Sequence, residues 1–331
     1  MQTEILKIDR ESILKAKQLL LQGEIVGIPT ETVYGLGAVG TNSSAVKKIY
    51  EVKGRPSDNP LIAHVHEKYD LSRLVEITMP YAKELIKRFT PGPLTLVFKS
   101  KGVVCKEATC GGETLAIRIP LHEGARQLLR EVNEPIVAPS ANLSKHTSPV
   151  TAMHVYNDLK GKIPLILDGG KCQGGIESTV LDVTSETPRI LRAGLITKEM
   201  IESVVGKCEI AQHKQGDKVK SPGVKYAHYQ PLCETKLFYA EEIDSAIKYY
   251  EEQIKLGKRV AIMCQEKFKE YFKFANHLSL GSTAEEMANL LYYKLLEGEK
   301  SADLIIAVAD NREDGVYRGV MNRLKKSCPR I

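Results

Sequence analysis

Short apolar or β-branched runs, each bounded by glycine or proline, recur along about the first 200 residues of this chain and alternate with amphipathic segments. Runs of this length are typical of buried strands, and the segments between them have the apolar spacing of helices. The alternation therefore predicts a mixed α/β domain. The expected strands are residues 25–28, 61–65, 94–98, 115–119, 136–138, 165–167 and 179–183, and the expected helices include 12–21 and 43–53.

The alternation stops near residue 209 and resumes near residue 235. Residues 211–220 are polar, and residues 221–231 (SPGVKYAHYQP) are rich in proline, glycine and tyrosine, which predicts a linker without regular structure over residues 209–233. A single core rarely grows beyond about 250 residues, and this chain has 331. We therefore expect domains at residues 1–208 and 235–331, joined by a linker at 209–234.

Beyond the linker, strand-like and helix-like segments alternate more regularly. Strands joined by crossover helices predict a small Rossmann-like parallel α/β domain. The expected strands are residues 236–239, 259–264 and 304–308, and the expected helices are 241–255, 282–296 and 316–326.

The composition narrows the class of protein. No stretch approaches the roughly 20 apolar residues that span a bilayer, and residues 1–10 lack the apolar core of a signal peptide, so we expect a cytoplasmic protein with no membrane partner. The seven cysteines contain no C-x-x-C pair, which favours reduced thiols over disulfides or a zinc site. His64 and His66 form an H-x-H pair without a visible partner cluster for a metal. The net charge of +6 suits an anionic ligand such as a nucleotide, or weak contact with RNA.

Gly35, Gly37 and Gly40 spell G-x-G-x-x-G between a predicted strand and a predicted helix. In a dinucleotide-binding fold such glycines end the strand, and a second strand ends in an acidic residue about 20 residues later. Here residues 29–34 intervene, and a helical pattern stands where the second strand should be. We therefore expect no dinucleotide site, and we expect the glycines to let the backbone turn tightly beside a ligand.

A candidate phosphate site follows the predicted helix 43–53. No G-x-x-x-x-G-K-[ST] motif is present, which excludes a P-loop. Residues 53–61 (KGRPSDNPL) are broken by glycine and proline, which predicts a rigid loop from which Lys53 and Arg55 project. Charge-assisted hydrogen bonds to phosphate contribute about 1.5–3 kcal/mol each, so the pair is a candidate triphosphate clamp. A solvated helix end whose cation suits the helix dipole is the equally open alternative.

Further polar residues follow or lie within predicted strands. Ser140 and Asn142 come directly after strand 136–138, at the end of a strand where open α/β sheets bind ligands. Simple turn chemistry, in which these side chains bond their own backbone, is the alternative. Arg118 lies inside a predicted strand, where a charge needs a partner or a ligand, and Arg192 follows another strand.

Together these segments resemble the YrdC-like domain, the catalytic unit of L-threonylcarbamoyladenylate synthases. Residues 221–231 resemble the linker of the long, two-domain form, and the C-terminal segment, with 322–324 (NRL), resembles its accessory domain. The resemblance implies an open twisted mixed sheet with helices, followed by a linker and a Rossmann-like parallel domain. The matching motifs are residues 28–37 (IPTETVYGLG), 53–61 (KGRPSDNPL), 90–95 (TPGPLT), 116–120 (AIRIP), 138–142 (APSAN) and 178–180 (STV).

The resemblance also implies an activity. Members of this family condense L-threonine, bicarbonate and ATP into threonylcarbamoyl-AMP and pyrophosphate. A downstream tRNA threonylcarbamoyltransferase complex then moves the threonylcarbamoyl group onto tRNA adenosine. We expect Mg²⁺ to be held mainly through the ATP phosphates, with no protein ligand assigned, and direct tRNA contact to be weak at most.

Site residues are carried over motif by motif. Lys53 and Arg55 are expected to be catalytic. The guanidinium of Arg118 can hold the threonine carboxylate bidentately. Tyr226, His228 and Tyr229 of the linker are expected to form a lid, with an ordinary packed strap between domains as the equal alternative. The expected ATP contacts are Lys53, Arg55, Asn59, Thr114, Ser140, Asn142, Ser148, Arg192 and Tyr226, and the expected threonine contacts are Thr32, His64, Arg118 and Ser178.

Two other functions were weighed. An RNA-binding YrdC-like module without threonine-dependent chemistry would interleave basic residues with exposed aromatics, but Phe, Tyr and Trp total only 6% and Trp is absent. A relative that serves another carbamoyl acceptor, as in hydrogenase maturation, would carry acylphosphatase-like and zinc-finger segments, of which this sequence shows neither.

Overall fold

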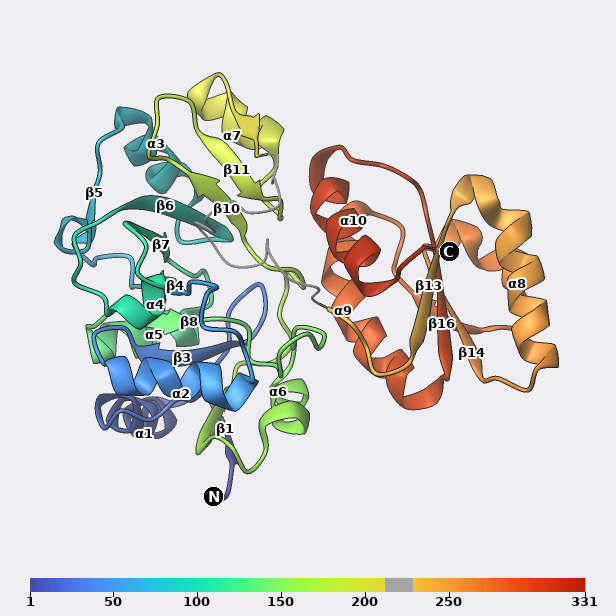
Figure 1. The fold of residues 1–331 in the computed structure, drawn as a ribbon, viewed down its shortest axis with the longest axis horizontal. Coiled ribbons are helices and arrows are strands. Elements are labelled where there is room, and N and C mark those ends of the chain that lie inside the picture. Colours follow the sequence, from blue (N-terminus) through green and yellow to red (C-terminus); the bar gives the residue numbers. More distant parts are fainter. Residues whose placement is uncertain (212–228, 331) are drawn as a thin grey trace.

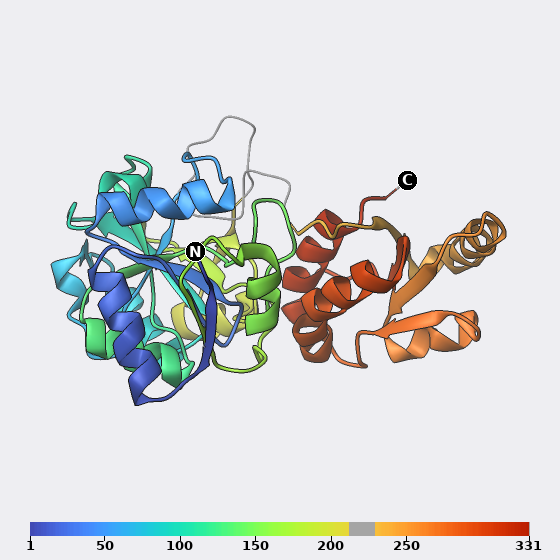
Figure 2. The ribbon, with the colours of Figure 1, turned by 90° about the horizontal axis from the view of Figure 1, so that it is seen from below.

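The computed structural model describes residues 1–211 and 229–330, which form two α/β units lying side by side (Figure 1, Figure 2). The first is built on a twelve-stranded mixed sheet and the second on a four-stranded parallel sheet. The predicted fold class is therefore confirmed. Within the described residues, no helix has the length and apolarity needed to cross a membrane.

The large sheet runs in the order β1-β9-β2-β3-β8-β4-β7-β6-β10-β11-β12, with β5 paired to β6. Parallel pairs such as β4 with β7 adjoin antiparallel pairs such as β4 with β8. The strands are β1 (Glu4–Lys7), β2 (Val26–Ile28), β3 (Gly35–Val39), β4 (Ile62–His64), β5 (Val75–Glu76), β6 (Leu94–Ser100), β7 (Thr114–Arg118), β8 (Ile136–Ala138), β9 (Leu165–Asp168), β10 (Thr179–Asp182), β11 (Arg189–Arg192) and β12 (Glu209–Ile210).

Helices cover the large sheet unevenly. Helices α1 and α5 pack on one face against β2, β8 and β9, while α2, α3, α6 and α7 pack on the other face. On the face away from those four helices, the central strands present a small apolar cluster made of strand residues alone: Ile62, Val97, Ala116, Val180 and Leu191. The helices of this unit are α1 (Arg10–Leu21), α2 (Ser43–Lys53), α3 (Pro80–Phe89), α4 (Lys106–Thr109), α5 (Glu123–Val132), α6 (Ala152–Leu159) and α7 (Lys198–Val205), with a 3₁₀ turn η1 (Leu71–Arg73).

Capping residues fix the ends of the helix that leads to the site. The Asn42 side chain accepts a hydrogen bond from the Ala45 backbone N–H at 3.0 Å and so caps the start of α2. Gly54 adopts a left-handed conformation (φ 60°) and ends the helix. Lys53 is therefore the last helical residue, and Arg55 lies in the loop beyond it.

The second unit has the strand order β13-β16-β14-β15, all parallel. Helices α9 and α10 cover the sheet face turned toward the first unit, and α8 covers the opposite face (Figure 1). The strand β15 was not predicted from sequence, because its four residues are mostly polar. The elements are β13 (Glu234–Tyr239), η2 (Ala240–Glu242), α8 (Ile243–Lys255), β14 (Val260–Cys264), η3 (Glu266–Phe272), β15 (Asn276–Ser279), α9 (Ala284–Ser301), β16 (Leu304–Ala309) and α10 (Gly315–Ser327).

The two units share one apolar core cluster, to which α9 and α10 contribute. Backbone approaches backbone at two glycines of this interface. A Cβ on Gly175 would lie 2.3 Å from the Ala288 carbonyl oxygen, and a Cβ on Gly319 would lie 3.1 Å from the Cα of Gly194. The Asn289 side chain also donates hydrogen bonds to backbone oxygens of the first unit, at 3.0 Å to Cys172 and 2.6 Å to Gln173. The interface is therefore closely packed.

The structure corrects two expectations about local structure. The first two glycines of the G-x-G-x-x-G motif lie in a strand, β3, so the predicted tight turn beside a ligand is wrong for them. They allow close packing instead: a Cβ on Gly37 would lie 2.3 Å from Ile28 Cδ1. The predicted linker also begins with regular structure, because Glu209–Ile210 pairs with β11 as strand β12. The domain boundaries stay a prediction.

Gly37→Ala is expected to destabilise the protein by about 1–3 kcal/mol, because the added methyl group overpacks the sheet against Ile28. Urea unfolding measures the change. Ile28→Val removes the colliding methyl group, so the double variant should lose less than the sum of the two single variants. Strict additivity would show that the contact with Ile28 is not the cause.

Candidate functional site

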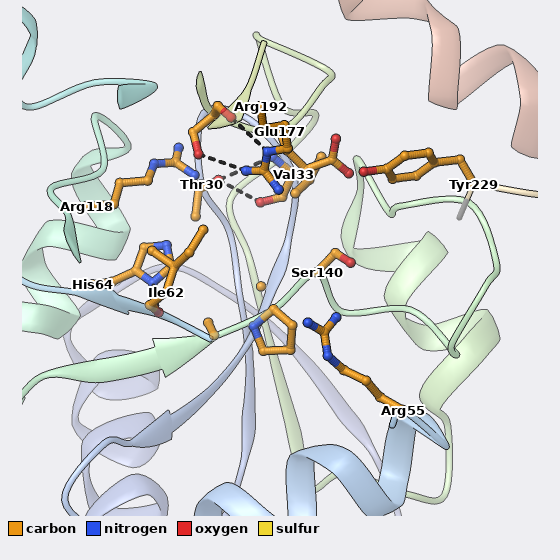
Figure 3. A pocket seen from close by; sticks show the side chains of 14 residues that line it. Thr30, Val33, Arg55, Ile62, His64, Arg118, Ser140, Glu177, Arg192 and Tyr229 are labelled. Atoms are coloured by element: carbon orange, nitrogen blue, oxygen red, sulfur yellow. Dashed lines mark hydrogen bonds between the residues drawn. The ribbon is translucent and has the colours of Figure 1, made fainter. Parts of the chain in front are cut away.

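A cleft lies over the open face of the central strands (Figure 3). Its floor includes Ile62 of β4 and Ala138 of β8, which are register partners in the sheet. Segments far apart in the sequence form its walls. The lining residues are Thr30, Val33, Gly35, Arg55, Ile62, His64, Arg118, Ala138, Pro139, Ser140, Glu177, Ser178, Arg192 and Tyr229.

Arg118 ends β7 and is the register partner of His64 at the end of β4. Both side chains are buried. Arg118 Nη2 lies 2.8 Å from Glu31 Oε1, and Glu31 Oε2 accepts a hydrogen bond from the Leu121 N–H at 3.0 Å. The Nε of Arg118 is buried and has no hydrogen-bond partner among the described residues. The guanidinium therefore keeps capacity for an anionic ligand.

His64 is held as a neutral imidazole. Its Nδ1 lies 3.1 Å from the Ile62 carbonyl oxygen, which can only accept, so Nδ1 donates. Burial, and then the neighbouring Arg118, lower the pKa of His64 to about 3. At neutral pH the residue contributes a polar edge to the cleft without adding charge.

Arg192, at the end of β11, is tied to the start of β10. Its Nε donates to the Ser178 carbonyl oxygen and its Nη2 to Ser178 Oγ, both at 3.1 Å (Figure 3). Ser178 Oγ also lies 2.8 Å from Thr95 Oγ1. These contacts fix a second guanidinium in the wall of the cleft.

The sequence predicts that Lys53 projects from the loop toward a ligand, but in the structure it does not line the cleft. Its ammonium donates to the backbone oxygen of Ser140 at 2.6 Å and to that of Asn142, and its side chain is almost fully buried. Burial, and then repulsion from Arg55, lower its pKa well below the ordinary lysine value. In this structure Lys53 therefore fastens the end of α2 to the loop at residues 140–142, and it is not among the lining residues.

Arg55 is the member of the predicted pair that lines the cleft. Its Nη2 donates to the Asn59 carbonyl oxygen at 3.1 Å and to that of Pro60 at 3.4 Å, which orients the guanidinium across the loop. Its Nε and both polar side-chain atoms of Asn59 are buried without partners among the described residues. Buried polar groups of this kind are normally satisfied by water or a ligand.

Glu177 adds a carboxylate to the same cleft. It accepts a hydrogen bond from Ser148 Oγ at 2.7 Å, from the Tyr292 hydroxyl at 3.0 Å and from Arg323 Nε at 3.1 Å. Burial by itself raises the pKa of Glu177, but Arg323, Arg192 and the Ser148 hydrogen bond lower it to about 2. The side chain is therefore ionised at neutral pH.

Six of the predicted contacts line the cleft together: Arg55, His64, Arg118, Ser140, Ser178 and Arg192. Four more touch a lining residue: Ser148 Oγ bonds Glu177, Thr32 Oγ1 lies 2.9 Å from Thr30 Oγ1, Lys53 donates to the Ser140 carbonyl oxygen, and the Asn59 carbonyl oxygen accepts from Arg55.

Thr114 and Asn142 are not among the residues that line the cleft. Thr114 shares a strand face with Arg118 but lies at the other end of β7, where it pairs with Lys99. The Asn142 amide donates to the backbone oxygens of Leu143 and His146, both at 2.8 Å. These contacts match the turn chemistry that was weighed as the alternative. Tyr226, with His228 of the predicted lid, lies outside the described residues.

Three polar residues of the site were not predicted: Thr30, Glu31 and Glu177. Tyr229 of the predicted lid does line the cleft. Thr30, Glu31 and Glu177 each stand next to or near a predicted contact in the sequence, which was the available signal. Glu31 and Arg118 lie far apart in the chain, so only the sheet order brings them together.

His146 ties the loop beside the cleft to the second unit. Its Nδ1 lies 2.9 Å from Asp158 and its Nε2 lies 3.1 Å from Glu299 of α9. Burial lowers the pKa of His146, but the hydrogen bonds to Asp158 and Glu299 outweigh it and raise the value to about 9. The imidazolium is therefore the stable form at neutral pH.

No group of three or more His, Cys, Asp or Glu side chains within residues 1–211 and 229–330 could hold a metal ion. The cleft instead gathers Arg55, Arg118 and Arg192 around one space. Such a site binds carboxylates and phosphates without a P-loop. Fold and site define an α/β protein with a cleft suited to polar anionic ligands on the open face of a mixed sheet.

Comparison with known proteins gives the family. A family model described as Telomere recombination (Sua5_yciO_yrdC) matches residues 18–194, and one described as Threonylcarbamoyl-AMP synthase, C-terminal domain, matches residues 196–328. Threonylcarbamoyl-AMP synthase of Bacillus subtilis is 43% identical over 98% of this chain and 95% of its own length. The Pyrococcus abyssi protein of the same name is 39% identical over 97% and 95%. The crystal structure of P. abyssi Sua5 complexed with L-threonine has a TM-score of 0.90 at 37% identity, over 100% of both chains. This chain belongs to the Sua5–YrdC–YciO family.

The charged His146 contact predicts a pH-dependent stability. The folded pKa of about 9 lies above the ordinary value of 6.5, so the stabilisation is complete below pH 6.5 and is lost as the pH rises through 9. The loss should reach about 3 kcal/mol at most. Thermal unfolding between pH 6.5 and 9 should show a steeper decline for the wild type than for His146→Gln. Parallel declines would contradict the assignment.

Proposed function

We propose that this protein is a threonylcarbamoyl-AMP synthase, which condenses L-threonine, bicarbonate and ATP into threonylcarbamoyl-AMP and pyrophosphate. The observation that carries the proposal is one cleft walled by Arg55, Arg118 and Arg192 in a chain whose relatives over its whole length bear that name. A carboxylate and a polyphosphate can bind there at once, because each needs a fixed guanidinium.

Threonine is proposed to occupy the end of the cleft near Arg118. The Nε of Arg118 can pair with the threonine carboxylate, while Glu31 holds Nη2 of the same guanidinium. The hydroxyl of the amino acid needs neutral polar partners, which Ser178 and the Thr30–Thr32 pair supply. The neutral edge of His64 completes this subsite without adding charge that would repel the amine.

ATP is proposed to occupy the space between Arg55, Ser140 and Arg192. Arg55 and Arg192 approach it from opposite walls (Figure 3). Lys53 acts on the nucleotide through the loop that it holds, because its ammonium is bound to the backbone oxygens of residues 140 and 142. Asn59, Thr114, Asn142, Ser148 and Tyr226 remain proposed contacts of ATP.

The chemistry needs orientation and charge stabilisation more than acid–base groups. The threonine amine and bicarbonate form a carbamate with loss of water. A carbamate oxygen then attacks the α-phosphorus, and the bond to pyrophosphate breaks. Negative charge grows on the phosphoryl and leaving oxygens, where Arg55 and Arg192 can stabilise it. Mg²⁺ carried on the nucleotide phosphates adds to this neutralisation.

The product is an acyl phosphate anhydride that water can hydrolyse. Tyr229 closes one side of the cleft and is 5% exposed, which limits the entry of water.

We propose that a tRNA threonylcarbamoyltransferase complex accepts the product and that direct contact of this protein with tRNA is weak. An RNA-binding module without threonine-dependent chemistry is the second candidate, supported by the basic net charge of +6.

The purified protein is expected to release pyrophosphate from ATP only when L-threonine and bicarbonate are both present. A coupled pyrophosphate assay with each component omitted in turn provides the measurement. Release without threonine, or no release at all, would refute the proposed activity. Salt-sensitive RNA binding without turnover would favour the second candidate.

Variants in the two proposed subsites are expected to show different kinetic defects. Arg55→Ala should raise the KM for ATP about tenfold or more and change the KM for threonine less, because one charge-assisted contact to phosphate is lost. Arg118→Ala should do the reverse. Arg189→Ala is the matched control, because this exposed arginine lies on the same strand as Arg192 and pairs with Glu209. Equal loss of both affinities in both variants would show that the subsites are misplaced.

A further inference from the structure

Glu177 stands out because it places a full negative charge in a cleft that is proposed to bind a polyanion. It lines the cleft together with Arg192 and Ser178 (Figure 3). Two of its three side-chain hydrogen-bond donors, Arg323 and Tyr292, come from the second unit. The third, Ser148, belongs to the loop beside the nucleotide space.

Arg323 is completely buried, on helix α10. Its Nε donates to Glu177 Oε2 at 3.1 Å, and its Nη1 donates to the backbone oxygens of Ala193 and Gly319. Ala193 is the residue that directly follows Arg192 in the chain. A single side chain of the second unit thus holds both the carboxylate of Glu177 and the backbone next to Arg192.

Charge balance explains why this contact matters to the cleft. A buried carboxylate without a partner costs several kcal/mol, so it either becomes protonated or takes the nearest cation. Arg192 is a cation of the same cleft, and its charge already acts on Glu177. With Arg323 in place, Glu177 has its own buried partner. Without Arg323, Glu177 would compete with phosphate for Arg192.

Tyr292 and Tyr229 enclose the pair. Their rings stack with centroids 5.3 Å apart, and the Tyr292 hydroxyl donates to Glu177 at 3.0 Å. Figure 3 shows the hydroxyl of Tyr229 pointing toward Glu177. The two rings exclude water from the carboxylate, which strengthens its interaction with Arg323.

We propose that Arg323 of the second unit is a positioning residue for the nucleotide subsite: it neutralises Glu177, so that this carboxylate does not compete with ATP for Arg192. The inference deepens the proposed function and rests on it. It assigns the second unit a part in setting the nucleotide subsite, in addition to its packing against the first.

The test uses full-length Arg323→Met, Arg323→Lys, Glu177→Gln and the double variant Arg323→Met/Glu177→Gln. Arg323→Met should raise the KM for ATP about tenfold or more, while the KM for threonine changes less than about threefold. Arg323→Lys keeps the charge, and the double variant removes the orphan carboxylate. Both should return the KM for ATP to within about threefold of the wild type.

Lys325→Met is the matched control, because Lys325 lies on the same helix and pairs with the exposed Glu313. Its KM for ATP should stay unchanged. If Arg323 only helps the units to pack, Arg323→Met and the double variant will lose stability with no selective change in the KM for ATP, and the proposal is overturned. Equal KM for ATP in Arg323→Met and Arg323→Lys would overturn it as well.

Titration with a fluorescent ATP analogue separates this proposal from the proposed function. If the wild type binds the analogue but releases no pyrophosphate, the activity is wrong, while the order of analogue affinities among the variants still tests Arg323. If the Arg323→Met variant does not fold, the Glu177→Gln variant alone tests the proposed role of Arg323. It removes negative charge from the cleft, so its affinity for the analogue should equal or exceed that of the wild type, and a tenfold or greater loss would refute the role of Arg323.

Discussion

Burial of charge is the constraint on which the cleft depends. A buried charged group is tolerated only when a partner holds it, and each charged wall residue here has one close by. Arg118 has Glu31, Glu177 has Arg323, and the guanidinium groups of Arg55 and Arg192 donate to carbonyl oxygens. These pairings keep the side chains in fixed positions before any ligand arrives. A site built in this way loses little free energy to reorganisation when a polyanion binds.

The sheet makes such a cleft possible because its central strands are left open on one face. Helices pack against the other face and against the outer strands. The floor of the cleft is therefore apolar, and charged residues stand at the ends of the strands. The loops that complete the walls are then held from behind: α2 fastens the loop at residues 140–142, and α9 and α10 fasten the segments around Glu177 and His146. Binding residues on loops are thus given the rigidity of the helices that hold them.

Much of this could be predicted from the sequence, and the failures have physical causes. Arg118 was identified because a charge within an apolar strand requires a partner, yet Glu31 could not be named as that partner, since strand order alone brings the two together. The sequence predicts the right loop for Lys53 but the wrong direction for its side chain. A local pattern does not reveal which carbonyl groups lie nearby. Strand β15 and the strand character of Gly35–Val39 were missed because polar residues and glycines carry little strand preference.

The glycine contacts between the units restrict how the molecule can move. At Gly175 and Gly319 the main chains already touch, so a sideways shift of one unit over the other would drive backbone atoms into one another. A side chain at either position would hold the two main chains apart, so the close fit of the units depends on hydrogen as the side group at both.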